Sequence, residues 1–503
     1  MTDTLRDPAT SSDIRRYQHF IDGKPGSGSG EVIARYSPVS GQVVAEYAAG
    51  TEADIDAAVL AARNAFNSGV WSDLPGLARG RALNRLASVL RNHVDELIAL
   101  DAAEVGTPQR VARGPVEAGI GQIDFAASLA STLHGEIHTN LGPDFTGLLV
   151  REPLGVVGLI VPWNFPTLIL CQKLGYALAA GCTAVVKPSE FTSGSAVRVA
   201  ELALEAGIPE GVVNVVTGYG NPVGQRLAEH PDVDLVSFTG STATGQRVLE
   251  SSKSNLKRVS LELGGKAAQI VFADADLDDA VEGVLFAAIH NQGECCVAGA
   301  RLLVEDSVAD EFLDRLAKRA GDLRLGGPDD EADLGALIHP DHMRKVLDYI
   351  NVGVQEGASI RAGGGQLDHP EYAQGCFVQP TILDNVTPTD RVFQEEIFGP
   401  VVTVTRFSGA DEAIELANVV EYGLGNTVWT KNIDKALTVT RRLHSGTVWV
   451  NTTIDGSPQL TFGGYKASGY GREMGKAGFE EYTQIKTIQI RTGTRVGKFG
   501  LLS

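Results

Sequence analysis

Short runs of β-branched and apolar residues alternate with longer segments of helical composition in the first half of the chain. Each run starts roughly 25 residues after the last, about the length of one strand-and-helix unit. The runs are Val156–Val161, Thr183–Lys187, Val212–Val216, Leu235–Phe238 and Arg258–Leu261. Because strands separated by helices pair in parallel, this alternation predicts an α/β fold with a doubly wound, Rossmann-like sheet of the kind that binds nucleotides.

A second alternating region follows the first and predicts a second α/β domain. Its first elements are a helix over Leu277–His290, a strand over Arg301–Val304 and a helix over Val308–Leu323. Upstream of both regions, Glu52–Phe66 and Arg79–Ala103 have apolar residues at helical spacing and predict packing helices. Two or more domains agree with the length of 503 residues, which is too long for one ordinary core.

The two ends of the chain differ from these regions. Met1–Gln18 is polar and lacks the apolar stretch of a secretory signal, so we expect a disordered arm. The tail Tyr482–Arg491 carries Ile485, Ile488 and Ile490 among polar residues and predicts a strand with no evident partner in the sequence. Because an unpaired exposed strand promotes aggregation, we expect this strand to pair, for example with another subunit.

Composition and charge argue against several classes of function. No stretch approaches the roughly 18 unbroken apolar residues that span a bilayer, so we expect a cytoplasmic protein without a membrane partner. The net charge of −19 argues against a nucleic-acid partner, because phosphate binding relies on clusters of Lys and Arg. The five cysteines include no C-x-x-C pair, so we expect free thiols and neither a disulfide framework nor a metal site.

Three segments that follow expected strands are candidates for a cofactor site. Thr217–Gly224 almost reproduces a G-x-G-x-x-G turn, but its spacing misses by one residue, which favours an ordinary strand-to-helix turn. In Phe238–Gly245 the amides of an expected helix N-terminus could bind a pyrophosphate, or Ser241 could simply cap the helix. Lys187 and Glu190 would meet ribose hydroxyls at a strand end, or form a surface ion pair.

Three further segments carry groups suited to catalysis. Asn291–Gly299 holds Cys295 and Cys296 in a glycine-flanked loop, where a thiol either acts as a nucleophile or merely packs. Glu262 ends an apolar strand, where burial would raise its pKa as suits a general base, unless a Lys or Arg pairs with it. Asn164 stands near two prolines and offers an amide to an oxyanion, although a proline-stabilised turn explains the same segment.

Taken together, seven segments in this order resemble the motifs of the aldehyde dehydrogenase superfamily over nearly the whole chain. They are Pro162–Pro166, Lys187–Glu190, Phe238–Thr242, Leu261–Lys266, Gly293–Cys296, Glu395–Val401 and Phe462–Lys466. The resemblance implies an N-terminal arm (1–18), a Rossmann-like cofactor domain (19–132 and 154–263), a second α/β catalytic domain (264–465) and a small β oligomerisation element (133–153 and 482–503). It implies oxidation of an aldehyde to a carboxylic acid with NAD(P)+, by a homodimer or homotetramer.

The resemblance also assigns roles to individual residues. Cys296 would be the nucleophile, since it stands three residues after the glycine of the family's G-[QE]-x-C motif, and Cys295 would be a neighbour. Asn164 and the Cys296 amide would form the oxyanion hole, and Glu262 would activate the water that hydrolyses a thioester. Cofactor contacts would come from Val161, Pro162, Trp163, Lys187, Glu190, Gly220, Gly224, Phe238, Gly240, Ser241, Leu263, Glu396 and Phe398.

Among these cofactor residues, Lys187 and Glu190 would hold the adenosine ribose, Gly240 and Ser241 the pyrophosphate, and Glu396 with Phe398 the nicotinamide side. Glu190 would accept ribose hydroxyls yet repel a 2′-phosphate, so we expect NAD, with NADP as the alternative.

Two neighbouring classes of protein compete with this interpretation. Relatives that transfer the acyl group to CoA typically lack the equivalent of Glu262, and its presence here favours hydrolysis. A crystallin-like scaffold that keeps the fold without turnover would be indicated by loss of Cys296, Glu262 or Asn164, and all three are present.

The residues of the implied aldehyde tunnel indicate a polar substrate. The tunnel would be lined by Phe165, Ile169, Gln172, His290, Cys295, Val297, Asp455, Gly456 and Phe462. Gln172 and His290 stand at positions that are often aromatic in relatives favouring apolar aldehydes, and Asp455 adds a negative charge. Relatives acting on acid semialdehydes can place an arginine at the position of Gln172. The lack of an arginine there disfavours that class of substrate.

Overall fold

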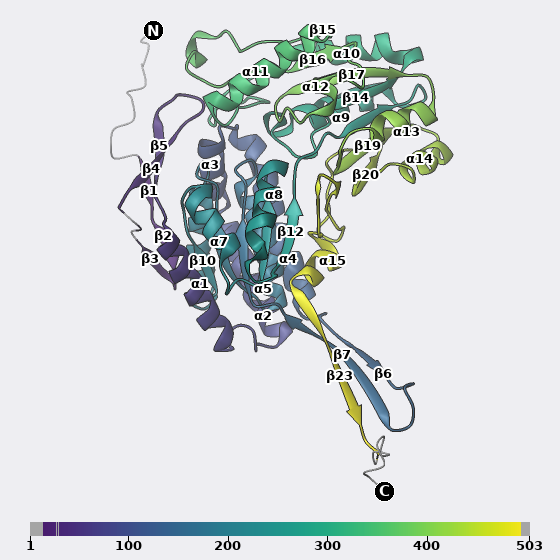
Figure 1. Ribbon diagram of the computed structural model, residues 1–503. Coiled ribbons are helices and arrows are strands. Elements are labelled where there is room, and N and C mark those ends of the chain that lie inside the picture. Colours follow the sequence, from purple (N-terminus) through teal and green to yellow (C-terminus); the bar gives the residue numbers. More distant parts are fainter. Residues whose placement is uncertain (1–13, 27, 29, 494–503) are drawn as a thin grey trace.

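The computed structural model describes residues 14–26, 28 and 30–493. The fold is mixed α/β with two large, mainly parallel sheets, as the alternation of strands and helices predicts. Figure 1 shows the second sheet above the first and a long β-ribbon projecting below. Among the described residues, no helix is long and apolar enough to cross a membrane.

The first sheet has eight strands in the order β22-β12-β11-β8-β9-β10-β2-β3. All five strands expected in the first alternating region form and pair in parallel. They are β8 (Val156–Ile160), β9 (Thr183–Lys187), β10 (Val213–Val215), β11 (Leu235–Thr239) and β12 (Arg258–Glu262). Antiparallel edges are added by β2 (His19–Ile21), β3 (Lys24–Gly26) and β22 (Gly469–Tyr470).

The order of these strands locates a binding edge. The chain runs from β8 outward to β9 and β10 on one side, then returns to β11 and β12 on the other side of β8. Open α/β sheets bind ligands outside the carboxyl ends of their strands at such a reversal of strand order. The segments that follow β8, β9, β11 and β12 therefore lie at the edge where a ligand is expected.

Helices cover both faces of the first sheet, over two separate apolar cores. Successive residues of β8 face opposite ways, so Val156 packs in one core and Val157 in the other. One face is covered by α1 (Glu52–Asn67), α7 (Gln225–Glu229) and α8 (Thr242–Ser251). The other is covered by α2 (Gly76–Asn92), α3 (Val94–Val105), α4 (Gln109–Ala130), α5 (Pro166–Ala180) and α6 (Gly194–Glu205).

The helical pattern over Arg79–Ala103 is interrupted in the structure. His93 takes φ −109° and ψ 16°, which ends α2 and starts α3. Apolar residues on either side of the break keep helical spacing, so the pattern of residues does not reveal it.

The second sheet has seven strands in the order β15-β16-β17-β14-β13-β19-β20. Its strands are β13 (Ala268–Val271), β14 (Arg301–Glu305), β15 (Ser359–Ala362), β16 (Thr381–Asp384), β17 (Val401–Phe407), β19 (Gly425–Trp429) and β20 (Thr447–Val450). All neighbours are parallel except β15 and β16. The accompanying helices are α9 (Leu277–Ile289), α10 (Ala309–Gly321), α11 (Pro340–Gln355), α12 (Arg391–Gln394), α13 (Ala410–Asn418) and α14 (Ile433–Thr440). The predicted second α/β region is thus confirmed.

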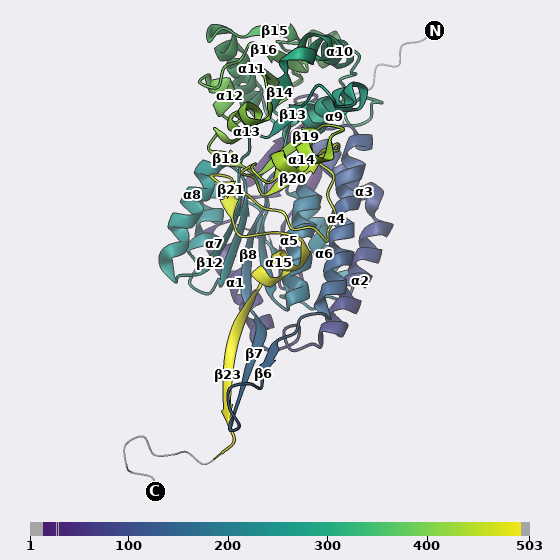
Figure 2. The ribbon, with the colours of Figure 1, turned by 90° about the vertical axis from the view of Figure 1, so that its right-hand side faces the viewer.

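The projecting ribbon contains β6 (Glu136–His138), β7 (Phe145–Pro153) and β23 (Thr483–Arg491), in the order β23-β7-β6. The strand expected in the tail forms, and its partner, which was not evident in the sequence, is β7 of the same chain. Figure 2 shows this ribbon extending from the body beside α15 (Gly475–Glu481).

Smaller elements complete the described chain. A three-stranded sheet contains β1 (Arg15–Tyr17), β4 (Val32–Tyr36) and β5 (Val43–Ala48), and a two-stranded one contains β18 (Tyr422–Gly423) and β21 (Tyr465–Lys466). Short helical turns span Gly220–Gly224, Ser252–Ser254, His290–Gly293, Asp306–Val308 and Pro370–Tyr372.

The expected disordered arm is wrong at its end, because Arg15–Tyr17 pairs in parallel with β5. The rest of the expected arm, residues 1–13, lies outside the described residues.

Candidate active site

The two adjacent thiols lie in a turn after the short helix His290–Gly293. Cys295 is buried, with 5% of its surface exposed, whereas Cys296 is only partly buried. A Cβ at Gly265 would lie 2.1 Å from the carbonyl oxygen of Cys296. Only glycine therefore lets the turn after β12 lie against the backbone of Cys296, and Cys296 is the more accessible thiol.

The two thiols influence each other strongly. A hydrogen bond with Cys295, followed by burial, raises the pKa of Cys296 well above its ordinary value of 9.0. The same hydrogen bond lowers the pKa of Cys295. Cys296 is thus held as a thiol in this environment, and a nearby positive charge or a base is required to generate its thiolate.

Asn164 reaches the thiol loop from the end of β8. Its Nδ2 donates a hydrogen bond to the carbonyl oxygen of Glu294 at 2.9 Å, and its side chain is buried. A carboxamide nitrogen carries two hydrogens. One hydrogen anchors the amide to the segment before Cys296, and the other remains for an oxyanion formed beside the thiol.

Asn291 holds Asn164 in place, a role that residue patterns did not reveal. Its Nδ2 donates to the carbonyl oxygen of Asn164 at 2.7 Å. Asn291 and Gln292 both take positive φ, 49° and 60°, a region that non-glycine residues seldom occupy and in which Asn is enriched. The asparagine in the Asn-Gln-Gly run was the only local signal for this turn.

Glu262 ends β12 with its carboxylate buried. Neither carboxylate oxygen has a hydrogen-bond partner in the described part of the chain. Burial, with a further contribution from Glu473, raises the pKa of Glu262 well above its ordinary value of 4.5. The sequence left two interpretations open for Glu262, a desolvated carboxylate and a carboxylate paired with a Lys or Arg. The structure agrees with the first and not with the second.

A second buried carboxylate, Glu473, was missed by sequence reasoning. It forms a buried ion pair with Lys173, and its other oxygen accepts a hydrogen bond from Gln172. Lys173 also donates to Ser237 at 2.7 Å. Lys173 and Glu473 stand 300 residues apart, so no local pattern connects them.

Lys187 and Glu190 are brought together at the carboxyl end of β9. The ammonium of Lys187 lies 3.5 Å from a carboxylate oxygen of Glu190, with Lys187 buried and Glu190 partly exposed. A Cβ at Gly224 would meet only Lys187, at 3.7 Å, and one at Gly220 would meet nothing within 4 Å. Gly224 thus leaves space beside Lys187, and the backbone at Gly220 is open, which fits the approach of a nucleoside.

The turn after β11 is suited to phosphate, although its glycines also have packing roles. Ser241 caps α8, accepting a hydrogen bond from the Thr244 amide at 3.3 Å. A Cβ at Gly240 would lie 2.5 Å from the ring of Phe238, and one at Gly245 would lie 2.5 Å from Leu263. Gly245 therefore makes room for Leu263, and the amides that face outward belong to the first turn of α8.

Glu396 is fixed next to the thiol loop. Its Oε1 accepts a hydrogen bond from the Gly265 amide at 2.8 Å, and a Cβ at Gly264 would lie 2.5 Å from Oε2. Burial raises the pKa of Glu396. Its charge in turn contributes to raising the pKa of Cys296, so the two groups lie close together.

Aromatic rings flank this region. Trp163 meets Phe398 edge-on, with ring centroids 5.4 Å apart, and both contact His342. His342 is 2.7 Å from the carbonyl oxygen of Phe398, through Nε2. Of the remaining residues with an expected cofactor role, Val161 is buried and its amide donates to the carbonyl oxygen of Lys187. Pro162 follows it in the same loop at the end of β8.

The residues expected along the tunnel are only partly connected by contacts. Phe165 stacks on His290 with ring centroids 5.5 Å apart. Phe462 exchanges two backbone hydrogen bonds with Glu473, the partner of Gln172. Ile169, Cys295 and Val297 pack in the same large core, and Cys296 and Phe462 pack against it. Asp455 and Gly456 lie on the loop after β20, where Asp455 accepts a hydrogen bond from Trp449 at 2.6 Å.

A cavity of about 400 Å³ opens beside His290, between α4, α9 and the end of α10. Each arginine at its rim is paired with a carboxylate, Arg110 with Asp333 and Arg319 with Glu282. The charges of the paired groups at its rim therefore balance, and His290 and Asn291, which precede the thiols in the chain, line the cavity.

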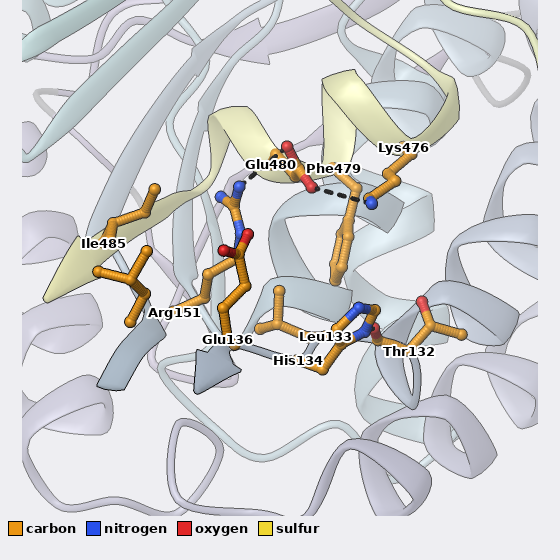
Figure 3. A pocket seen from close by; sticks show the side chains of 11 residues that line it. Thr132, Leu133, His134, Glu136, Arg151, Lys476, Phe479, Glu480 and Ile485 are labelled. Atoms are coloured by element: carbon orange, nitrogen blue, oxygen red, sulfur yellow. Dashed lines mark hydrogen bonds and ion pairs between the residues drawn. The ribbon is translucent and has the colours of Figure 1, made fainter. Parts of the chain in front are cut away.

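A smaller cavity of about 110 Å³ lies at the root of the ribbon (Figure 3). Figure 3 shows Arg151 and Lys476 pointing toward Glu480, with Phe479 and His134 beside them. None of the expected catalytic or cofactor residues lines this cavity.

Comparison with known proteins gives a consistent result. Residues 26–488 match the family model described as "Aldehyde dehydrogenase family". The chain is 43% identical to a betaine aldehyde dehydrogenase of Bacillus subtilis, over 94% of this chain and 97% of that one. It is 42% identical to the NADP/NAD-dependent aldehyde dehydrogenase PuuC of Escherichia coli, over 94% and 95% of the two chains. A crystal structure of an NAD-dependent aldehyde dehydrogenase from Sinorhizobium meliloti is 44% identical, covers 98% of each chain and superposes with a TM-score of 0.95.

Proposed function

The chain belongs to the aldehyde dehydrogenase family and is an NAD(P)-dependent aldehyde dehydrogenase, and on that basis we propose that Cys296, Asn164 and Glu262 perform the chemistry. The observation that carries this proposal is the buried carboxylate of Glu262, which has no hydrogen-bond partner among the described residues and lies near a partly accessible thiol. Asn164 binds the carbonyl oxygen of Glu294, two residues before that thiol. A carboxylate in this state suits a general base that activates water.

The first step is attack on the aldehyde. The sulfur of Cys296 bonds to the carbonyl carbon, and the carbonyl oxygen becomes an oxyanion. The free hydrogen of the Asn164 amide and the backbone amide of Cys296 stabilise this charge. The bound cofactor supplies the hydride acceptor and, when oxidised, a positive charge that favours the Cys296 thiolate.

The second half of the reaction removes the acyl group. Once hydride has left the carbon, Cys296 carries a thioester. Glu262 takes a proton from water, the resulting hydroxide attacks the thioester carbon, and the Cys296 sulfur leaves with the carboxylic acid released. The raised pKa of Glu262 makes its carboxylate a stronger base than an exposed glutamate.

Asn164→Ala is expected to lower kcat by about 10²- to 10³-fold, because one oxyanion donor is lost. The measurement is NADH formation under saturating aldehyde and cofactor. Cofactor affinity, followed by NADH fluorescence, should stay unchanged. A variant that keeps wild-type kcat would show that Asn164 does not contact the oxyanion.

For the cofactor, the residues that fit are Lys187 and Glu190 at the adenosine ribose, the first turn of α8 after Gly240 and Ser241 at the pyrophosphate, and Glu396 with Phe398 at the nicotinamide side. The contact of Trp163 with Phe398 and the open space at Gly220 and Gly224 support this arrangement. It favours NAD, because the carboxylate of Glu190 repels a 2′-phosphate.

Glu190→Gln is expected to raise kcat/KM with NADP relative to NAD by on the order of tenfold, since a like-charge contact is removed. Glu205→Gln provides a control, because Glu205 is an exposed carboxylate at the far end of α6. The ratio of the two cofactor efficiencies is measured with one aldehyde. An unchanged ratio would show that Glu190 does not determine the choice between NAD and NADP.

We further propose a homodimer or homotetramer assembled through the ribbon. Ile485, Ile488 and Ile490 are exposed, and residue parity places Ile485 on the opposite face of β23 from the other two. Both faces of the ribbon are therefore partly apolar, and β23 and β20 each leave one sheet edge open. The cavity at the ribbon root adds charged groups near these faces (Figure 3).

Sedimentation velocity is expected to find a dimer or tetramer for the wild type and smaller species for Ile488→Glu. Ile360→Glu is the matched control, since Ile360 is also exposed but lies on β15 at the other end of the second sheet. A monomeric wild type would contradict the proposed assembly.

A reducing, cytoplasmic location is supported by the five free thiols. Cell fractionation tests it, and recovery from an oxidising compartment would contradict it.

A further inference from the structure

The amide of Gln172 is held in one orientation. Its nitrogen donates to one oxygen of Glu473, and the other oxygen of Glu473 is paired with the buried Lys173. A carboxylate only accepts hydrogen bonds, so the NH₂ group of Gln172 must face Glu473. The carbonyl oxygen of Gln172 is then directed away from Glu473, where it is an acceptor with a fixed position.

Gln172 lies on the same stripe of α5 as two residues of the core against which Cys296 packs. Phe165, Ile169 and Gln172 are spaced by four and three residues, which places them along one stripe of the helix. The stripe begins next to Asn164. Phe165 and Ile169 belong to the core against which Cys296 packs.

The partner of Gln172 also lies close to Glu262. Glu473 exchanges backbone hydrogen bonds with Phe462 at 2.8 Å. At the next residue, a Cβ on Gly463 would lie 3.0 Å from Oε1 of Glu262. The end of the stripe and the proposed general base thus flank the same short segment.

The two cationic side chains near Glu262 and Glu473, Lys173 and Arg472, form hydrogen bonds with other groups of the protein. The ammonium of Lys173 is shared between Glu473 and Ser237. The guanidinium of Arg472 donates to the carbonyl oxygens of Gly464 and Gly471. Lys173 and one nitrogen of Arg472 are thus bound to protein groups, and the polar group that the stripe presents is the Gln172 carbonyl.

We propose that Gln172 selects aldehydes that carry a hydrogen-bond donor, a hydroxyl or an N–H ammonium, which its side-chain carbonyl oxygen accepts. This inference rests on the proposed function, because it assumes that the aldehyde reacts at Cys296. A trimethylammonium group has no N–H, and an amide presents no aromatic face to it. The similarity to a betaine aldehyde dehydrogenase therefore does not extend to that substrate at this position.

The test is a comparison of kcat/KM, by NADH formation, for aldehydes of matched length that end in amino, hydroxyl, methyl, carboxylate or trimethylammonium groups. The amino and hydroxyl members are expected to exceed the methyl member by about 10- to 100-fold, as for a hydrogen bond in a desolvated site. The two members also show whether ammonium or hydroxyl is the better donor.

Gln172→Met is expected to remove this preference, so that the ratio of amino or hydroxyl to methyl efficiency approaches unity. The ratio does not depend on how much enzyme is correctly folded. Gln42→Met, at an exposed turn before β5, serves as the matched control and should keep the wild-type ratio.

A wild type that prefers the methyl, carboxylate or trimethylammonium member overturns the inference, and so does a donor preference that survives Gln172→Met. These results would leave the roles of Cys296, Asn164 and Glu262 untouched. Absence of NADH with every member would instead contradict the proposed function.

Discussion

Replacing Cys296 by alanine is expected to lower aldehyde oxidation by at least about 10⁴-fold, the effect typical of a lost covalent nucleophile. Of the five cysteines, Cys296 alone is partly accessible, and the other four are buried. Steady-state NADH formation measures the loss. NADH binding, followed by fluorescence, should be retained because the cofactor contacts are unchanged.

Cys295→Ala is the matched control for this variant. It removes the neighbouring thiol and with it the hydrogen bond that raises the pKa of Cys296. Turnover should therefore persist, with reaction at lower pH than in the wild type. If instead Cys295→Ala is inactive and Cys296→Ala turns over, the two assignments must be exchanged.

Glu262→Gln is expected to separate acylation from deacylation. The amide cannot take a proton from water, so steady turnover should fall by about 10²- to 10⁴-fold. Hydride transfer does not need this base in the proposed mechanism. Rapid mixing should then show a burst of NADH close to one equivalent per active site, followed by a slow phase.

The pH dependence of deacylation follows from the same residue. Only the ionised carboxylate accepts a proton, and burial raises the pKa of Glu262. Deacylation by the wild type should therefore decline as pH falls through this raised pKa, at higher pH than for an ordinary glutamate. Deacylation by Glu262→Gln should not show this pH dependence. If the steady turnover of Glu262→Gln equals that of the wild type, Glu262 is not the general base of deacylation.

Sequence reasoning predicted the elements of the two sheets well, because their signal is local. The runs that became β8 to β12 are short and mainly apolar, and a glycine or proline lies within about three residues of each. Local patterns did not reveal the pairing of β7 with β23, because the two strands are far apart in the chain, and only the family resemblance placed both segments in one β element. The break at His93 was missed because helical spacing continues across it.

Some residues of the candidate site could likewise be predicted from local sequence, and others could not. Asn164, Glu262 and Cys296 could be proposed because each stands in a recognisable segment at the end of a strand or in a glycine-flanked loop. Asn291 and Glu473 were missed, because their importance depends on contacts formed only in the folded chain. The orientation of an amide, as at Gln172, is decided by its partner, and residue type alone does not reveal it.

The tight contact of Gly265 with the backbone of Cys296 has a consequence for the evolution and engineering of this enzyme. A single added methyl group at residue 265 would collide with the main chain that carries the nucleophile. Natural variation is therefore expected to spare this residue while the walls that meet the substrate diversify. New substrate ranges are best sought by library mutagenesis along α5, with the glycine turn kept constant.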